Sequence, residues 1–499
     1  MKEKMGSQHF PVYILLSLLA TAVIIPIINS ESFGKVKALI IATLSIALGL
    51  SVRTLQEVYK NGGYTYNFGN WNEKIGVQLV VDEFSAFMGL FIVALSFLIV
   101  IYSLKDIEHE IKPQQFTGFY TLVFILLFSM LGMTYTNDLF NMYVFMEILS
   151  ITSCSIISIK RKKENYMASL RYLILNTMGS LSVLLGIALL YMVSGQLNMT
   201  QIYLTISKIW NLYPTNILVA VGFILTGLGI KAAVFPLHVW LPDAHSTAPT
   251  PSSALLSSIV VKVYIFSAYK ILFKVLGQTI VVGLGIPTYI TYFAAIGMIM
   301  GSIFAIGQKD IKRMLAYSSV AQIGYIFLGL GLATVEGLSA SLFHIISHGL
   351  MKSALFLSAG SIIYYKEKRD LRDLDGIGYE MPITMTVFTI AAFGMIGIPG
   401  ISGFMSKLYL SFAVLGANKP IYLAIILISS FLNAVYYLPI VISAFLKESK
   451  NRRNIMAIER LPKLMLVPMV IIAVAVVAIG FYPQIIMTLV EKAVPTFLL

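Results

Sequence analysis

Long apolar runs separated by short charged segments are the feature that most constrains this chain. A helix needs about 20 predominantly apolar residues to cross a bilayer. Inside lipid only helices and closed barrels satisfy their own backbone hydrogen bonds, and these runs lack the alternating polarity of barrel strands. The chain is therefore expected to form about fourteen transmembrane helices. The runs lie near residues 10–28, 36–58, 80–103, 117–135, 136–159, 167–193, 216–235, 253–273, 286–306, 314–334, 337–364, 382–415, 420–446 and 464–490.

Composition supports the same fold class, an all-α polytopic membrane protein. Of the 499 residues, 58% are hydrophobic and only 12% are charged. Soluble domains carry roughly 25% charged residues. Lys2 and Lys4 precede the first run as in a signal peptide, but no small-residue cleavage site follows, so we expect a retained helix.

Lysine and arginine are distributed unevenly between alternate loops. Of 36 such residues, 22 fall in loops on one side and 10 on the side that holds both termini. The positive-inside rule makes the first side cytoplasmic and places the termini outside. The net charge of +13 is therefore a sign of topology, and no nucleic-acid partner is expected.

A few charged residues remain inside the predicted spans. Glu147 is the one acid expected deep in a span, and Asp138, nine residues earlier, is expected near the outer surface, about 13 Å away. The four cations are Lys231, Lys262, Lys352 and Lys407. Each charge at the bilayer centre costs about 2.5–3.5 kcal/mol on insertion scales.

A structural ion pair explains only part of this set. One Glu–Lys pair leaves three lysines without an acidic partner, and Lys262 and Glu147 lie too far from a helix end to reach the interface. Burial disfavours the charged form of lysine, whereas a nearby carboxylate favours it. Moving the carboxylate would switch a lysine between holding and releasing a proton. The pattern favours a proton relay over a purely structural role.

His344, His348 and Lys352 are spaced at i, i+4 and i+8, which places them on one helix face. A single core histidine is usually only hydrogen-bonded, but two in register with a buried lysine favour a proton wire. Histidines at i and i+4 also suit zinc. No third ligand is obvious, so we expect no metal site.

Two predicted spans contain helix-breaking residues. In "GLGIKAAVFPLHVWLPDAHS", Lys231 comes five residues before Pro236. In "FGMIGIPGISGFMSKLYLS", Lys407 follows Pro399 and Gly400. Such residues often produce ordinary kinks. Breaks in both halves of a chain, each beside an intramembrane lysine, are instead typical of a transport site built from an internal repeat.

These segments, together with "DLFNMYVFMEILSITS", "KDIKRMLAYSSVAQIGY" and "HIISHGLMKSALFLSAG", resemble a known family over about 135–415. The family comprises antiporter-like subunits of respiratory complex I, Mrp-type cation/proton antiporters and membrane-bound hydrogenases. The resemblance implies two inverted five-helix repeats, each with a broken helix. The corresponding divisions of the chain are 1–116 (N-terminal helices), 117–280 (first half-channel), 281–447 (second half-channel) and 448–499 (C-terminal helix).

The resemblance also implies a role for each intramembrane residue. Glu147 pairs with Lys231, Lys262 is the next relay, and Lys407 is the terminal lysine of the second half. His344, His348 and Lys352 form the central bridge. Lysine at 352 and 407 points to the D-type Mrp protein, its hydrogenase counterpart or the N-type complex I protein, and "FNMYVFMEI" favours the first two.

The predicted function is that of a proton-translocating subunit in a multi-subunit complex of the prokaryotic plasma membrane. Its partners are other membrane subunits, the lipid bilayer and protons, with any coupled sodium handled by the wider complex. One alternative is a self-sufficient cation/proton antiporter, which is disfavoured because sodium prefers oxygen ligands and the interior offers one carboxylate. Another is a structural subunit with vestigial charges.

No catalytic or redox centre is expected in this chain. Cys154 is the single cysteine, which excludes an internal disulfide, and an iron–sulfur cluster usually needs four thiolates. The glycines of "GFILTGLG" lie in a predicted span without a βαβ unit, and there is no Walker motif. We therefore expect no cofactor. Any oxidoreductase chemistry, NADH dehydrogenase-like or hydrogenase, would come through partner subunits.

Overall fold

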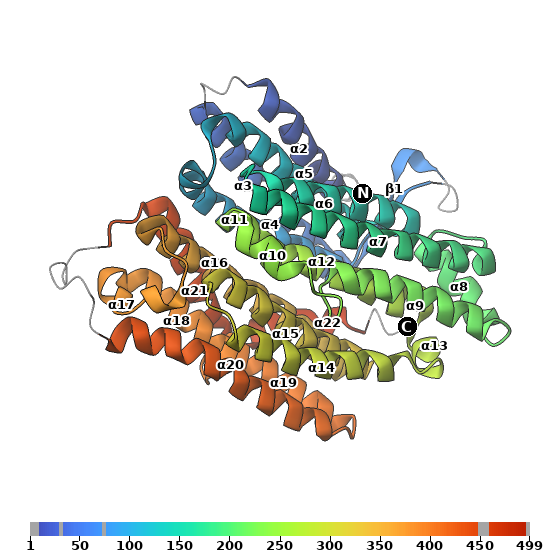
Figure 1. Ribbon diagram of the computed structural model, residues 1–499. Helices are drawn as coiled ribbons and strands as arrows, with labels where there is room; N and C mark the ends of the chain where they lie inside the picture. The colour runs from blue at the N-terminus through green and yellow to red at the C-terminus, as the bar shows by residue number, and fades with distance from the viewer. Residues whose placement is uncertain (1–8, 29–32, 72–75, 448–458, 496–499) are drawn as a thin grey trace.

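The structure is a computed structural model, and it describes residues 9–28, 33–71, 76–447 and 459–495. Lys2 and Lys4 lie outside the described residues, as does the start of the predicted C-terminal division. Most helices run side by side along one direction (Figure 1). A small antiparallel hairpin pairs β1 (Tyr64–Asn67) with β2 (Gln78–Val81), with Tyr64 opposite Val81. The expected helical membrane fold is confirmed, and this hairpin is an addition to it.

The first half of the chain forms the blue to green part of Figure 1. In chain order it contains α2 (Phe10–Ile24), η1 (Ile25–Ile27), α3 (Phe33–Asn61), η3 (Phe68–Asn70), α4 (Glu83–Glu110), η4 (Pro113–Gln115), α5 (Phe116–Tyr135), α6 (Leu139–Ser158), α7 (Lys163–Ser194), α8 (Met199–Ile209), α9 (Pro214–Lys231), α10 (Leu241–Thr247), α11 (Thr250–Leu255), η5 (Leu256–Val260), α12 (Val261–Tyr269), η6 (Lys270–Leu276) and α13 (Gln278–Gly283). The segments η5 and η6 are π-helical.

The second half forms the yellow to red part. It contains α14 (Ile286–Ile306), α15 (Ile311–Leu332), α16 (Val335–Lys366), η7 (Leu371–Asp373), α17 (Ile377–Glu380), α18 (Pro382–Ile396), α19 (Ser402–Gly416), α20 (Ile421–Leu446), α21 (Lys463–Phe481) and α22 (Gln484–Ala493). The hairpin, α8 and α13 lie at one end of the bundle, and α17 lies at the opposite end (Figure 1).

Twelve helices among the described residues are long and apolar enough to cross a membrane. The two remaining predicted spans are divided into shorter elements. The run near 253–273 forms α11, η5, α12 and η6, and the run near 382–415 forms α18 and α19. Each apolar run predicted from the sequence therefore has a helical counterpart.

Polar residues at helix starts fix the position of several spans. Asp138 caps α6, where its carboxylate accepts a hydrogen bond from the backbone N–H of Asn141 at 2.7 Å. Asp82, Asp310 and Thr334 cap α4, α15 and α16 in the same way. An N-cap side chain satisfies a backbone donor that the first turn leaves free. The caps of Asp138 and Thr334 therefore fix where α6 and α16, two of the helices that carry predicted site residues, begin.

The core is centred on α16, whose most apolar 18-residue window is entirely buried. This helix packs against α15, α18, α19 and α21. Elsewhere small residues let helices approach closely, as is common between membrane helices. A Cβ atom on Gly227 would lie 2.3 Å from the carbonyl oxygen of Gly179, so α9 meets α7 backbone to backbone. This contact positions the end of α9, four residues later.

Several helices extend further than the apolar runs indicated, which corrects the assignment of charges to loops. Because α4 continues to Glu110, Asp106 is only 1% exposed. Lys312, just before the run at 314–334, and Lys270, near the end of the run at 253–273, were both counted with the loop cations, but each is 2% exposed. Lys270 donates to the carbonyls of Met133, Thr134 and Thr136 at the end of α5. This arrangement is typical of a structural cap.

Candidate functional site

Lys231 is the last residue of α9 and is fully buried. Its Nζ lies 3.6 Å from Oε1 of Glu147 and donates a hydrogen bond to Oγ of Ser150 at 2.6 Å. The Ser150 hydroxyl also meets the hydroxyl of Tyr264 on α12 at 3.2 Å. The lysine therefore has a charged and a neutral partner one turn apart on α6.

Glu147 lies near the middle of α6, as expected for an acid deep in a span, but at the surface of the isolated chain. Its side chain is 28% exposed in the isolated chain, although the oxygen nearest Lys231 is covered. Neighbouring side chains on α6 and α7, such as Val144, Ile151 and Leu170, are also exposed. The carboxylate thus lies at the edge of the helical bundle, with Lys231 on its buried side.

The chain is not helical between Lys231 and the start of α10 at Leu241. Pro236 lies within this break. Trp240 donates its indole N–H to the carbonyl of Ile230 at 2.7 Å, which satisfies one acceptor that the end of α9 leaves free. A cation at a helix C-terminus is favoured by the helix dipole.

Lys262, also fully buried, donates to the backbone carbonyl of Ser257 in the π-helical segment η5. A π-helical turn changes the local hydrogen-bond register and is frequent at functional sites. The Ser257 hydroxyl meets that of Ser319 on α15 at 2.9 Å. Lys352 on α16 donates to Ser318 and to the carbonyl of Leu315 at 2.7 Å. Ser318 therefore contacts Lys352 directly, and Ser319 contacts the serine whose carbonyl accepts from Lys262.

The two histidines of α16 stack with ring centroids 5.8 Å apart, and both are fully buried. Nδ1 of His344 lies 2.9 Å from Oγ of Ser406 on α19. Within the described part of the chain, neither ring nitrogen of His348 nor Nε2 of His344 has a hydrogen-bond partner. These nitrogens are therefore not committed to structural hydrogen bonds.

Lys407 follows Ser406 and is 6% exposed. Its Nζ donates to the carbonyls of Met395 at 2.8 Å and Ile396 at 3.0 Å, and to Oγ of Ser430 at 3.0 Å. The two carbonyls belong to the last residues of α18. Lys407 thus reaches back across the break to the end of the preceding helix, where the dipole favours a cation.

The second break runs from Gly397 to Ile401 and contains Pro399 and Gly400. Gly397 and Gly400 have φ of 96° and 85°, which residues with a Cβ rarely adopt. A Cβ atom on Gly403 would lie 1.9 Å from the carbonyl oxygen of Gly394, so α19 begins in direct contact with α18. Glycine permits both the turn and the close packing that brings Lys407 to the end of α18.

The structure brings some predicted residues together and separates others. Glu147 lies beside Lys231, and His344 contacts the residue next to Lys407. Lys262, Lys352 and Lys407 form no ion pair within the described residues, and their partners are carbonyls and hydroxyls. Within the same residues, no group of three or more His, Cys, Asp or Glu side chains could hold a metal ion.

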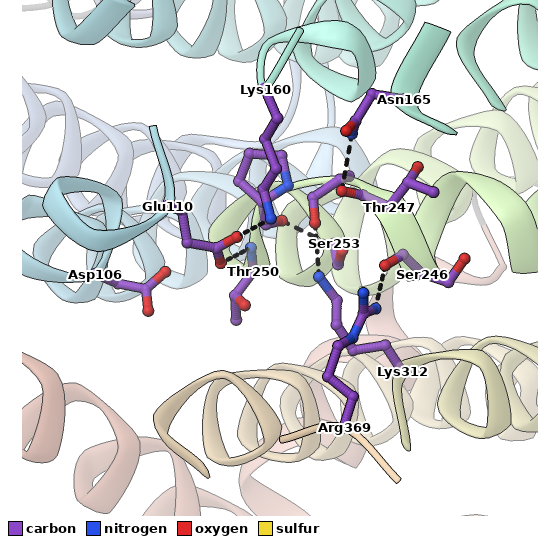
Figure 2. A network of polar contacts seen from close by, with 12 residues as sticks. Asp106, Glu110, Lys160, Asn165, Ser246, Thr247, Thr250, Ser253, Lys312 and Arg369 are labelled. Carbon is purple, nitrogen blue, oxygen red and sulfur yellow. Dashed lines mark hydrogen bonds and ion pairs between the residues drawn. The ribbon is translucent and has the colours of Figure 1, made fainter. Parts of the chain in front are cut away.

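A second polar cluster, missed in the sequence, surrounds the joint between α10 and α11 (Figure 2). Glu110 at the end of α4 pairs with Lys160, and Lys312 donates to the carbonyl of Ala248 at 2.6 Å. In the sequence these residues sit among many charges and look like loop residues. The i, i+4 spacing of Asp106 and Glu110 is the signal that could have indicated a helix face.

Comparisons with known proteins agree on a family. Residues 136–433 match the family described as "NADH:quinone oxidoreductase/Mrp antiporter, TM". The N-type subunit of an NADH-quinone oxidoreductase from Desulforudis audaxviator is 34% identical, over 98% of this chain and 99% of its own. The D-type subunit of a Na⁺/H⁺ antiporter from Alkalihalophilus pseudofirmus is 30% identical, over 89% and 87%. "FNMYVFMEI" suggested the D-type Mrp protein or its hydrogenase counterpart, and the higher of these two identities is to an N-type subunit instead.

Solved structures show the same architecture. A protein of the membrane-bound sulfane sulfur reductase, an archaeal respiratory membrane complex, superposes with a TM-score of 0.89 at 28% identity, covering 99% of this chain and 98% of that one. A protein of the Mrp complex from Dietzia has the same TM-score at 24% identity, covering 99% and 97%, and shows the shared fold alone.

The family match covers more than half of this chain, and the chain has the same helical architecture as the solved structures. The chain belongs to the NADH:quinone oxidoreductase/Mrp antiporter transmembrane family. It is a multi-pass membrane protein whose relatives are subunits of multi-subunit membrane complexes.

Proposed function

We propose that this chain is a proton-translocating subunit of a multi-subunit complex in the prokaryotic plasma membrane, with both termini outside. The relay consists of Glu147, Lys231, Lys262, His344, His348, Lys352 and Lys407. The observation that carries the proposal is the burial of four lysines in membrane helices, three of them bound only to neutral oxygens. Burying a permanently charged lysine in such a place destabilises the protein, so its presence is best explained by a function.

Lys231 is the switching element of the first half. While Glu147 lies beside it, the carboxylate stabilises the ammonium form. When Glu147 moves away, Ser150 can still accept a hydrogen bond from the amine, but the stabilising negative charge is lost. The lysine then releases its proton toward the interior, and the return of Glu147 restores its affinity for the next proton.

The remaining residues carry the proton across the centre. The hydroxyls of Ser257, Ser318 and Ser319 lie between the elements of Lys262 and Lys352. The histidine pair on α16 then leads to Ser406 and Lys407. In this proposal residues 117–280 and 281–447 form two half-channels that meet at α16. Sodium, where it is coupled, is handled by other subunits.

The test is proton transport by the intact complex in proteoliposomes. Glu147→Ala and Lys231→Ala should each abolish coupled transport while subunit composition, checked by native gels and mass spectrometry, stays unchanged. Glu164→Ala, which alters an exposed carboxylate, is the matched control. Near-normal transport by either relay variant would refute the proposal and would favour a structural subunit with vestigial charges.

A further inference from the structure

The cluster around the α10–α11 joint contains a buried carboxyl group that the relay does not use. Figure 2 shows Lys160, Lys312, Arg369 and Glu110 converging on the joint from different elements, with Asp106 beside Glu110 on α4. Glu110 is fully engaged, because one oxygen pairs with Lys160 and the other accepts the backbone N–H of Thr250 at 2.6 Å. Asp106 is not engaged in the same way.

Asp106 is 1% exposed, yet its Oδ2 has no hydrogen-bond partner in the described part of the chain. Its Oδ1 accepts a hydrogen bond from the hydroxyl of Tyr102 at 3.5 Å, the limit of a hydrogen bond, and its other polar neighbour is the carboxyl group of Glu110. An ionised carboxylate buried without donors is strongly disfavoured, whereas a protonated one carries no charge and little penalty. The geometry therefore suits Asp106 as a neutral acid holding one proton.

Charged groups of both signs lie near Asp106 and act on that proton in opposite directions. Glu110, one turn away, disfavours a second negative charge, whereas Lys312 and Lys160 favour it. Arg369 is directed elsewhere, since it pairs with Asp310 and donates to the carbonyl of Ser246. Small movements of the two lysines would shift the balance between these opposing effects.

The cluster is also connected to the relay. Side chains from separate elements hold the joint, with Asn165 donating to the carbonyl of Thr247 at 2.9 Å and Lys312 to that of Ala248. Immediately before the joint lies His245, which is fully buried and has no hydrogen-bond partner on either ring nitrogen within the described residues. Its imidazole ring lies 5.1 Å from the ring of Phe356 on α16, and Nζ of Lys352 lies 5.9 Å from the same Phe356 ring.

We propose that Asp106, supported by Glu110 and Lys312, is an additional proton-binding site that takes up protons at the α17 end of the bundle and supplies the relay. During turnover the proton leaves the Asp106 carboxyl toward Lys312 and His245, and another replaces it from the loop side, with no other bond made or broken. The inference rests on the proposed function, since it requires that protons move through the chain.

The variant Asp106→Asn tests whether the Asp106 proton exchanges during transport or has only a structural role. Asparagine has nearly the size of the neutral acid but cannot release a proton. In the purified complex we expect loss of the infrared band of a protonated carboxyl and a fall in proton transport of about tenfold or more, equivalent to about 1.4 kcal/mol. Asp373→Asn, at an exposed carboxylate, should change neither.

Transport by Asp106→Asn at the wild-type rate, in a preparation where Glu147→Ala is inactive, would overturn this proposal and leave the proposed function intact. Should the variant fail to assemble, the wild-type complex gives a second test. A hydrophobic carbodiimide reacts with protonated carboxyls in apolar surroundings, and peptide mass spectrometry should find the adduct on Asp106 rather than on Glu110. An unmodified Asp106 would overturn the proposal.

Discussion

The two helix breaks each hold a buried lysine, but they hold it in different ways. Lys231 ends the helix before its break and lies between a carboxylate and a hydroxyl. Lys407 lies in the helix after its break and binds two backbone carbonyls and a hydroxyl. The first site can be switched by moving a charge. The second can be switched only by moving the helix ends themselves.

The largest expected effect is the loss of transport when Lys231 loses its charged partner. Glu147→Gln keeps the size of the side chain but removes the charge, so Lys231 loses the group that switches it. Transport should fall at least about tenfold.

No equivalent carboxylate accompanies Lys407 among the described residues, so the second break is tested by Lys407→Ala. We expect a comparable loss of transport. Unchanged cation efflux from vesicles carrying Lys407→Ala would remove this lysine from the pathway.

A smaller effect should come from the two hydroxyls that bind the lysines. Ser150→Ala and Ser430→Ala each remove one hydrogen bond to a lysine, worth about 1 kcal/mol, and we expect transport to slow about fivefold. Initial rates in proteoliposomes measure the change. Ser155→Ala, whose hydroxyl bonds only its own helix, is the control. Equal rates for all three variants would show that the hydroxyls do not assist.

The smallest expected difference is that between the two backbone contacts that position the lysines. A Cβ at Gly403 meets the backbone oxygen of Gly394 at 1.9 Å, and one at Gly227 meets that of Gly179 at 2.3 Å. Overpacking of this kind costs about 1–3 kcal/mol, so Gly403→Ala should lower the melting temperature slightly more than Gly227→Ala. Gly222→Ala, where no atom lies within 4 Å, should be neutral. A larger fall in melting temperature for Gly227→Ala than for Gly403→Ala would show that the α7–α9 contact is more tightly packed than the α18–α19 contact.

Much of the fold and part of the site followed from the sequence because both depend on polarity along the chain. Apolar length is enough to identify spans, and a lysine beside proline and glycine is visible at Lys231 and Lys407. The chemistry of membrane helices therefore predicted the breaks and the buried cations without knowledge of their neighbours.

Other features depend on packing between segments far apart in the sequence. Ser150 contacts Lys231 across 81 positions, and nothing near either residue indicates it. Asp106 and Lys312 lie outside the predicted apolar runs and Lys270 lies near the end of one, because charged residues usually mark the end of a span. In the structure the helices continue and these side chains are buried. The sequence placed Glu147 deep in a span, but it could not show that this part of α6 lies at the edge of the bundle.

Lys262→Met provides the most direct test of the claim that the buried lysines are present to carry protons. Methionine is close to lysine in length and needs no hydrogen bond, and it removes an ammonium group whose burial without a counter-charge is costly. The complex should therefore keep its subunits and its melting temperature, or gain stability, while proton transport in proteoliposomes is lost. Transport at the wild-type rate in an intact Lys262→Met complex would contradict the account.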